Sequence, residues 1–309
     1  MAVEKSYRPV TLADFKGQEK TKRLLEIYIK AAKMKNEQLD HVLISGPSGT
    51  GKTTLAHIIG NELEKEIKVY SAPTIKKVDE LVDILSSVEP GTVLFLDEVH
   101  ALNQKLSEAL FLAMETFTVN SNLEGIQETL NLPHFTVIGA TTNLGDMPEA
   151  MINRFQIKIA LQPYNSNQMA DIIKQSYAAM SVDIDDECAE MIAGTSRGVP
   201  RIANSHLRRV YDFALVLNDG IITKEIIEES FEVMGVNKYG LNQMDVDYLS
   251  YLHKACKAVG VDSIAMALNT DKKTLENNVE PYLVQCGYIY KSPRGRMISE
   301  KGKEVLWSE

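Results

Sequence analysis

A glycine-rich segment near residue 50 has the residue types and spacing that bind phosphate groups. It reads Gly46-Pro-Ser-Gly49-Thr-Gly51-Lys52-Thr53 and lies between an apolar run and a helical stretch. In such a loop, backbone N–H groups point at phosphate oxygens, the lysine neutralises the β- and γ-phosphates, and the threonine hydroxyl binds Mg²⁺. A glycine-rich turn without a ligand is the alternative, which the strand before the segment and the helix after it disfavour. The pattern predicts a site for ATP and Mg²⁺ that contains Gly49, Gly51, Lys52, Thr53 and Thr54.

An apolar run that ends in two carboxylates supplies the second part of a hydrolytic site. Thr92-Val-Leu-Phe-Leu leads directly into Asp97 and Glu98. At the tip of a strand, Asp97 is suited to hold Mg²⁺ and Glu98 to polarise the attacking water. Acidic pairs also occur in surface turns, but the upstream glycine-rich loop favours the catalytic interpretation. His100 follows closely, and we interpret it as structural because the histidines lack metal-ligand spacing.

The elements that position these residues alternate between strands and helices in the first half of the chain. The predicted strands are His41–Ser45, Lys68–Ser71, Thr92–Leu96, Phe135–Ala140 and Lys158–Leu161, and the predicted helices are Lys52–Leu63, Val78–Ser87 and Gln104–Met114. Almost entirely apolar strands that alternate with helices predict an α/β fold with a parallel sheet covered on both faces.

The second half of the chain changes character twice. From Asn165 to Lys238 only amphipathic helices remain, which predicts a small helical domain with helices at Ser166–Met180, Asp186–Ala193, Val199–Leu217 and Thr223–Val233. Three further helices, at Gln243–Ala258, Ser263–Ala267 and Lys272–Gln285, precede two β-rich arms around Pro293-Arg-Gly295. Helices followed by a basic hairpin indicate a winged helix. We therefore predict an ATPase domain at residues 1–167, a helical lid at 168–238 and a winged-helix domain at 239–309.

Composition excludes several classes of protein. Hydrophobic residues make up 44% and charged residues 24% of the chain, as in globular domains. No apolar run approaches the roughly 18 residues of a membrane span, and the first residues lack the apolar core of a secretory signal. Cys188, Cys256 and Cys286 lie far apart and form no Cys-x-x-Cys pair. We therefore expect a cytoplasmic protein without disulfides, zinc or membrane contact.

The net charge of −9 is unevenly distributed along the chain. From Tyr239 to the end, nine basic side chains balance nine acidic ones, so all of the excess acid precedes this point. Within Cys286–Lys303, basic residues face only one acidic residue, Glu300; they are Lys291, Arg294, Arg296, Lys301 and Lys303. This stretch is the candidate for contacts to nucleic-acid phosphates. A solvated charged hairpin is the alternative, and charge alone favours it.

Further motifs extend over nearly the whole chain. They are Arg8-Pro9, Gly17-Gln18-Glu19, Asp40-His41-Val42-Leu43, Thr54-Leu-Ala-His-Ile-Ile59, Ile138-Gly-Ala-Thr-Thr142, Arg154-Phe155, Arg197-Gly-Val-Pro-Arg201-Ile-Ala-Asn204, Glu280-Pro-Tyr-Leu283 and Pro293-Arg-Gly-Arg296. With the glycine-rich loop, they resemble the RuvB-type Holliday-junction branch-migration ATPases of the AAA+ class. The last three motifs are far more specific than a phosphate-binding loop.

The resemblance implies roles for residues at matching positions. Tyr7, Arg8 and Tyr164 would line the adenine pocket, and Thr142 would be the polar sensor of the γ-phosphate. Arg154 would be an arginine finger that reaches a neighbouring subunit's nucleotide, and Arg201 a second sensor that couples nucleotide state to domain closure. Lys291, Arg294 and Arg296 would contact DNA. Fixed guanidinium groups suit phosphoryl transfer because they stabilise concentrated negative charge. The alternative for any one arginine is a weak surface ion pair, which the motif context outweighs for Arg154 and Arg201 more than for Arg294.

Several positions depart from the family's pattern. Ala101 and Asn143 stand where the family usually has arginine, and Thr116 replaces an acidic residue. The segment from Phe117 to Pro133 is shorter than the family's protruding hairpin, and its apolar residues Val119, Leu123, Ile126 and Leu130 are interspersed with Glu124 and Glu128. These differences indicate a divergent member, of the kind that phages and other mobile elements carry. They also predict weak binding to a standard RuvA-type partner, since a buried unpaired carboxylate is costly.

The resemblance implies an ATP-hydrolysing DNA helicase that assembles into a hexameric ring and translocates duplex DNA. A helicase- or clamp-loader-type ATPase, acting as a DNA-linked switch, is the first alternative. A DNA-binding protein with a decayed ATPase is the second. The intact residues Lys52, Thr53, Asp97, Glu98, Thr142, Arg154 and Arg201 argue against the latter, because a binding protein does not need all of them.

Overall fold

The computed structural model describes residues 8–123, 126–179 and 184–307 and divides the chain into two compact units. The first unit comprises Met1–Gln168 together with Val199–Arg201, and the second comprises Met169–Gly198 and Ile202–Glu309. Tyr7, which the sequence places in the adenine pocket, lies outside the described residues.

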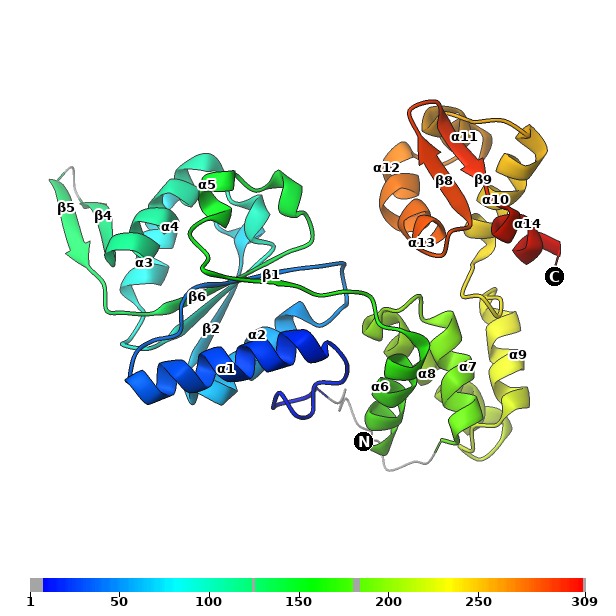
Figure 1. Cartoon of the computed structure of the whole chain (residues 1–309), viewed down its shortest axis with the longest axis horizontal. Helices are drawn as coiled ribbons and strands as arrows, with labels where there is room; N and C mark the ends of the chain where they lie inside the picture. Colours follow the sequence, from blue (N-terminus) through cyan, green and yellow to red (C-terminus); the bar gives the residue numbers. More distant parts are fainter. Residues whose placement is uncertain (1–7, 124–125, 180–183, 308–309) are drawn as a thin grey trace. The chain divides into compact units, whose positions relative to one another are not determined.

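The first unit is built on a five-stranded parallel sheet with the strand order β2-β3-β6-β1-β7 (Figure 1). The strands are β1 (Val42–Ser45), β2 (Ile67–Ser71), β3 (Val93–Asp97), β6 (Thr136–Thr141) and β7 (Ile157–Ala160). Each lies within one or two residues of a predicted strand, so the expected parallel α/β sheet is confirmed. In a parallel sheet all carboxyl ends meet at one edge, so the segments that follow β1, β3 and β6 are brought together there.

Helices cover both faces of this sheet (Figure 1). Side chains alternate between the faces along β1, where Val42 and Ile44 join one buried cluster and Leu43 the other. One cluster includes Leu25 of α1 (Glu19–Lys35) and residues of α2 (Lys52–Leu63); the other includes residues of α3 (Val78–Ser86) and α4 (Gln104–Thr116). The remaining short helices are α5 (Glu149–Ile152) and the single 3₁₀ turns Ala72–Thr74, Val99–Ala101 and Leu144–Asp146.

A two-stranded antiparallel hairpin follows α4. Its strands are β4 (Thr118–Leu123) and β5 (Ile126–Asn131), paired from Thr118↔Asn131 to Leu123↔Ile126. Val119 is 1% exposed and belongs to the core between α3 and α4, and Leu130 packs partly against the same core. The hairpin base is therefore part of the ATPase-domain core.

Four helices follow, as the sequence predicts, and most of their residues belong to the second unit: α6 (Ser166–Ala178), α7 (Asp186–Thr195), α8 (Pro200–Leu217) and α9 (Lys224–Met234). Asp185 caps α7 and Thr223 caps α9 through side-chain oxygens, in line with the preference for these residues at helix N-termini. Tyr177, Ile192, Leu207 and Ile227 are buried between the helices.

The winged-helix part of the second unit contains α10 (Gln243–Ala255), α11 (Val261–Ala267), α12 (Lys272–Thr274), a π-helical turn (Leu275–Val279), α13 (Glu280–Gln285), β8 (Ile289–Ser292), β9 (Gly295–Ile298) and α14 (Glu300–Trp307). Strands β8 and β9 pair as the expected hairpin. The helix predicted over Lys272–Gln285 is confirmed in its limits, but it contains the π-helical turn Leu275–Val279 just before Glu280 and Pro281. Proline has no N–H to continue the regular helical hydrogen bonds, which accounts for the change at this point. No helix in the described ranges is long and apolar enough to cross a membrane.

Candidate ATPase site and its surroundings

The glycine-rich loop has the backbone conformation that only glycine adopts without strain. Gly49 and Gly51 have φ angles of +79° and +105°, in the left-handed region. A Cβ on Gly49 would lie 2.8 Å from Val199 Cγ1 and 2.9 Å from Arg201 Cβ. Any residue with a Cβ at these positions would disrupt this backbone conformation. The conformation leaves backbone N–H groups of the loop accessible to a phosphate.

Lys52 is the first residue of α2, and its side chain lies within the loop. Its ammonium donates to Gly46 O (2.8 Å) and Pro47 O (3.0 Å), and Lys52 is only 6% exposed. Burial lowers the pKa of Lys52, while Glu98 and Asp97 oppose this by attracting the positive charge. A cation and the free N–H groups of a helix N-terminus therefore lie at the same point, which is the arrangement that binds phosphate.

The predicted base and the predicted sensor contact each other at the carboxyl edge of the sheet. Asp97 ends β3, and its Oδ1 accepts the N–H of Glu98 at 3.1 Å. Glu98 Oε2 accepts hydrogen bonds from Thr142 Oγ1 (3.0 Å) and Thr142 N (3.3 Å). Because β3 and β6 are neighbouring parallel strands, residues 44 positions apart in sequence meet at this edge.

His100 belongs to the same cluster, which the sequence analysis did not anticipate. Its Nδ1 lies 3.3 Å from Glu98 Oε2 and 3.0 Å from Thr141 Oγ1. His100 follows Glu98 by two residues, so proximity in sequence was the available signal. When the imidazole carries its proton on Nδ1, it donates toward Glu98 Oε2 and helps to orient Glu98.

Two further predicted residues lie against the loop. Tyr164 is buried and its hydroxyl donates to Thr50 O at 3.2 Å, while burial raises the pKa of Tyr164. Arg201, which belongs to the first compact unit, donates from Nη1 to Ser48 Oγ (3.2 Å) and from its backbone N to Gly49 O (3.4 Å). Arg8, at the start of the described residues, is exposed.

Arg154 lies at the other edge of the sheet. It precedes β7, so it sits near the amino ends of the parallel strands, whereas the glycine-rich loop follows the carboxyl end of β1. Its Nη1 donates to Glu115 Oε1 at 2.9 Å, and the two side chains are 42% and 52% exposed. Arg154 is thus partly accessible on a surface that its own nucleotide loop does not reach.

Comparison with known proteins identifies the family. The chain matches the P-loop domain of the Holliday junction DNA helicase RuvB over residues 7–161, the RuvB AAA lid domain over 164–237 and the RuvB C-terminal winged-helix domain over 238–307. The chain belongs to the RuvB family. Its predicted fold class, a P-loop domain with a parallel sheet, a helical lid and a winged helix, is confirmed.

Similar RuvB proteins match over their full length. The Holliday junction branch migration complex subunit RuvB of Wolbachia sp. subsp. Brugia malayi is 40% identical over 97% of this chain and 93% of its own. That of Campylobacter fetus is 42% identical over 98% and 90%. The solved Thermotoga maritima RuvB Holliday junction branch migration motor superimposes with a TM-score of 0.86 at 39% identity, covering 98% of both chains.

The wing of this RuvB family member holds an ion-pair network that the sequence analysis missed. Glu280 is fully buried, and its Oε1 accepts from Arg296 Nε (2.8 Å) and Tyr248 Oη (2.7 Å). Lys291 pairs with Glu280 Oε2, and Arg296 Nη2 also contacts Glu276 Oε1 at 3.1 Å. Burial alone would raise the pKa of Glu280, but the hydrogen bonds from Arg296, Lys291 and Tyr248 hold it below the usual value.

This network changes the expectation for the wing arginines. The Arg296 side chain is 17% exposed and engaged by two carboxylates, because a buried Glu280 without cations would be unstable. Arg294 lies in the exposed turn between β8 and β9, with its N–H bonded to Ser292 Oγ. Of the predicted DNA contacts, only Arg294 lies outside the network, and the charge pattern could not distinguish it from its neighbours.

Proposed function

We propose that this RuvB family member is an ATP-driven motor that translocates duplex DNA at Holliday junctions as a hexameric ring. The observation that carries the proposal is the position of Arg154 at the sheet edge opposite the glycine-rich loop. A finger there serves a neighbour's nucleotide, which requires a ring or a similar oligomer. Relatives that match over at least 90% of their own length are named as subunits of the Holliday junction branch migration complex.

Within one subunit, different residues at the carboxyl edge of the sheet bind the nucleotide and activate the attacking water. Lys52 and the loop N–H groups bind the phosphates of ATP, and Arg201 beside Ser48 reads their presence. Glu98 takes a proton from the attacking water, and Thr142 holds the Glu98 carboxylate in one orientation. Tyr164, packed on Thr50, closes the adenine side of the site.

The donor set at this edge fits Mg²⁺. Thr53 and Asp97 offer hydroxyl and carboxylate oxygens, and Mg²⁺ usually takes one or two such protein ligands while phosphates and water complete its shell. A carboxylate accepts about four bonds, so the bond from the Glu98 N–H leaves Asp97 capacity for a metal. Among the described residues, no group of three or more His, Cys, Asp and Glu side chains could hold a metal alone. When bound, Mg²⁺ neutralises phosphate charge.

A switch that loads another protein onto DNA is the competing function, since it uses the same nucleotide chemistry. Processive branch migration separates the two. The purified chain with ATP should move a synthetic four-way junction to products over many base pairs, and Glu98→Gln should not. Electron microscopy of the chain with an ATP analogue and junction DNA should show closed rings around duplex arms. Hydrolysis without branch migration, with or without a partner protein, would favour the switch.

We further propose that a standard RuvA-type protein binds this chain weakly. Val119 and Leu130, two of the four apolar hairpin residues, pack on the ATPase core, and Glu128 is exposed among the rest. The other apolar residues, Leu123 and Ile126, and the nearby Glu124 lie outside the residues whose side chains are described. Sub-micromolar binding of a standard RuvA-type protein, lost on changing Leu123 and Ile126 to alanine, would overturn this proposal.

The departures Ala101, Thr116 and Asn143 support a mobile-element origin for the gene. The three cysteines, unpaired in the structure, are consistent with a reducing cytoplasm. Sequencing the genes on either side tests the origin: a chromosomal recombination operon would contradict it.

A further inference from the structure

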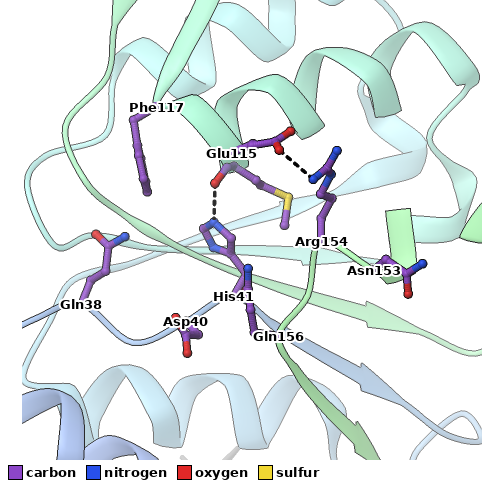
Figure 2. A pocket seen from close by; sticks show the side chains of 9 residues that line it. Gln38, Asp40, His41, Glu115, Phe117, Asn153, Arg154 and Gln156 are labelled. Atoms are coloured by element: carbon purple, nitrogen blue, oxygen red, sulfur yellow. Dashed lines mark hydrogen bonds and ion pairs between the residues drawn. The ribbon is translucent and has the colours of Figure 1, made fainter. Parts of the chain in front are cut away.

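A polar cavity of about 340 Å³ lies beside Arg154 on the first compact unit (Figure 2). Its wall includes Arg154 from the loop before β7, Glu115 and Met114 from the last turn of α4, and His41 directly before β1. The ATPase chemistry described above uses only Arg154 of these four residues. Figure 2 shows the Glu115 carboxylate pointing toward the Arg154 guanidinium, with His41 below Glu115.

The ion pair between Glu115 and Arg154 restricts the position of the Arg154 side chain but uses few of its N–H donors. One carboxylate oxygen meets one guanidinium nitrogen at 2.9 Å. A guanidinium has five N–H donors, so most of them stay available to a phosphate. A half-exposed ion pair by itself contributes only about 0–1 kcal/mol. The ion pair can therefore orient Arg154 only if the rest of the protein holds Glu115 in place.

His41 holds the turn of α4 that carries Glu115. The imidazole is 4% exposed; its Nδ1 accepts the N–H of Val137 at 2.9 Å, which leaves Nε2 to donate to Met114 O at 3.1 Å. Met114 directly precedes Glu115. Burial lowers the pKa of His41 despite the Met114 bond and Asp40, so the ring stays neutral and keeps its acceptor.

The same imidazole lies beside Arg154 and contacts or adjoins two of the three strands that lead to the nucleotide site, β1 and β6. His41 directly precedes β1, whose other end runs into the glycine-rich loop, and Val137 belongs to β6, whose other end runs into Thr142. Phe117, at the end of α4, packs edge-on against Phe135 with ring centroids 5.8 Å apart, which fixes the same turn from its far side.

We propose that Glu115 is the positioning residue of the Arg154 finger and that His41 fixes Glu115 relative to strands β1 and β6. The inference rests on the proposed action of Arg154 on a neighbouring subunit. Its consequence is directional: a change at Glu115 impairs hydrolysis in the next subunit and leaves hydrolysis in its own subunit unaffected.

The test uses the full-length chain with junction DNA and steady-state ATP hydrolysis. Glu115→Ala should lower kcat by about tenfold, within the 10²-fold that a 1 Å misplacement costs, and leave the KM for ATP unchanged. Glu115→Gln keeps an acceptor for Arg154 and should retain most of the activity. Glu108→Ala, an exposed glutamate on the same helix, is the matched control and should behave as wild type.

Mixed oligomers decide whether Glu115 acts through the finger. Glu98→Gln subunits carry an intact finger but no base, so mixing them with Glu115→Ala subunits should restore hydrolysis at the Glu115→Ala sites. Full activity of Glu115→Ala alone would overturn the proposal. So would a defect that stays unrecovered in mixtures that do rescue Arg154→Ala. If Arg154→Ala itself is not rescued while subunits exchange, the trans action of Arg154 is wrong, and the positioning role is rejected with it.

The role of His41 is tested by comparing the His41→Asn variant with Glu115→Ala. His41→Asn retains an acceptor for Val137 and loses the donor to Met114, so it should give a trans-rescuable defect like that of Glu115→Ala. Thermal unfolding accompanies the assay. A folded His41→Asn protein with full activity, or with a defect that Glu98→Gln subunits cannot rescue, would remove His41 from the proposal. Should the variant not fold, the Glu115 variants alone decide.

Discussion

Thr142 Oγ1 donates a 3.0 Å hydrogen bond to Glu98 Oε2 across the carboxyl edge of the parallel sheet. A hydrogen bond to a charged group contributes about 1.5–3 kcal/mol, enough to hold the carboxylate in one rotamer. The proposed base Glu98 is therefore bonded to Thr142, the proposed sensor of the γ-phosphate. A displacement of Thr142 would change the orientation of the Glu98 carboxylate.

Glu98→Gln should bind ATP and hydrolyse it very slowly. The amide keeps the shape of the side chain but cannot take a proton from water, and general-base catalysis contributes about 10²–10⁴ in rate. Thr142→Val, which loses the Oγ1 hydroxyl but keeps the backbone N–H bond to Glu98, should lower kcat less, by about tenfold. Nucleotide binding by fluorescent analogue and steady-state hydrolysis measure both variants. Robust turnover by Glu98→Gln would exclude Glu98 as the base.

Lys52→Ala should lose tight ATP binding instead. The buried ammonium between Gly46 O and Pro47 O is the positive charge nearest the phosphates, and the variant leaves their charge uncompensated. The binding assay distinguishes this variant from Glu98→Gln, whose affinity should stay near that of wild type. Equal ATP affinity in Lys52→Ala and wild type would contradict the assignment of the loop.

Arg154→Ala should lose about 10³–10⁵ of the hydrolysis rate, as the loss of a trans-acting arginine does. Mixed with Glu98→Gln, which is also inactive, it should recover part of the activity at interfaces where an intact Arg154 meets an intact Glu98. Recovery is measured against the mixing ratio. No recovery while labelled subunits are seen to exchange would show that the finger does not act between subunits.

The wing arginines should separate into two kinds. Arg294→Ala should weaken binding to all DNA sequences and lower the salt slope by about 0.9 for each phosphate that is no longer neutralised, with little change in stability. Arg296→Ala should destabilise the protein by about 3–5 kcal/mol, because it leaves the buried Glu280 short of a cation. Salt-dependent DNA binding and denaturant unfolding measure the two effects. A stable Arg296→Ala protein with a reduced salt slope would place Arg296 on the DNA.

Acid should destabilise the winged-helix part through Glu280. Its pKa is lower in the folded chain than the ordinary value of 4.5, so its ion pairs stabilise the fold above that pH and lose their effect as pH falls through the folded pKa. Fluorescence of Trp307, the only tryptophan, reports unfolding of this part. Glu280→Gln should be less stable at neutral pH and show a flatter dependence below pH 4.5. Identical pH profiles would contradict the role of Glu280.

Much of the fold could be predicted from the sequence because its strands are short apolar runs with polar ends. Helix α2 has the predicted limits, Lys52–Leu63. Helix α1 was not predicted: its N-cap residue Gln18 makes no side-chain cap, and only Leu25, Ile29 and Ala32 of its 17 residues are buried. Nothing in the sequence indicated the pairing of Glu280 with Arg296, 16 positions away, or of His41 with Met114, 73 positions away. Such contacts depend on tertiary packing, and local spacing does not encode them.

Arg197 joins the helical lid to the winged helix within the second unit. Arg197 follows α7, pairs through Nη2 with Asp245 Oδ2 and donates from Nε to Gly240 O at 2.9 Å. Its guanidinium also lies 4.9 Å from the centroid of the Tyr282 ring. Asp245 is fully buried, and burial raises its pKa although Arg197 and the N–H of Asn242 oppose this.

Removing Arg197 should therefore lower the free energy of unfolding by more than the loss of a surface ion pair does. Arg197→Ala leaves Asp245 without its cation and should destabilise the second unit by about 3–5 kcal/mol. The double variant Arg197→Ala with Asp245→Asn should be more stable than the sum of the two single losses predicts, by about 0.5–3 kcal/mol of coupling. Trp307 fluorescence during urea unfolding measures all three. Strict additivity would mean that the two side chains act independently.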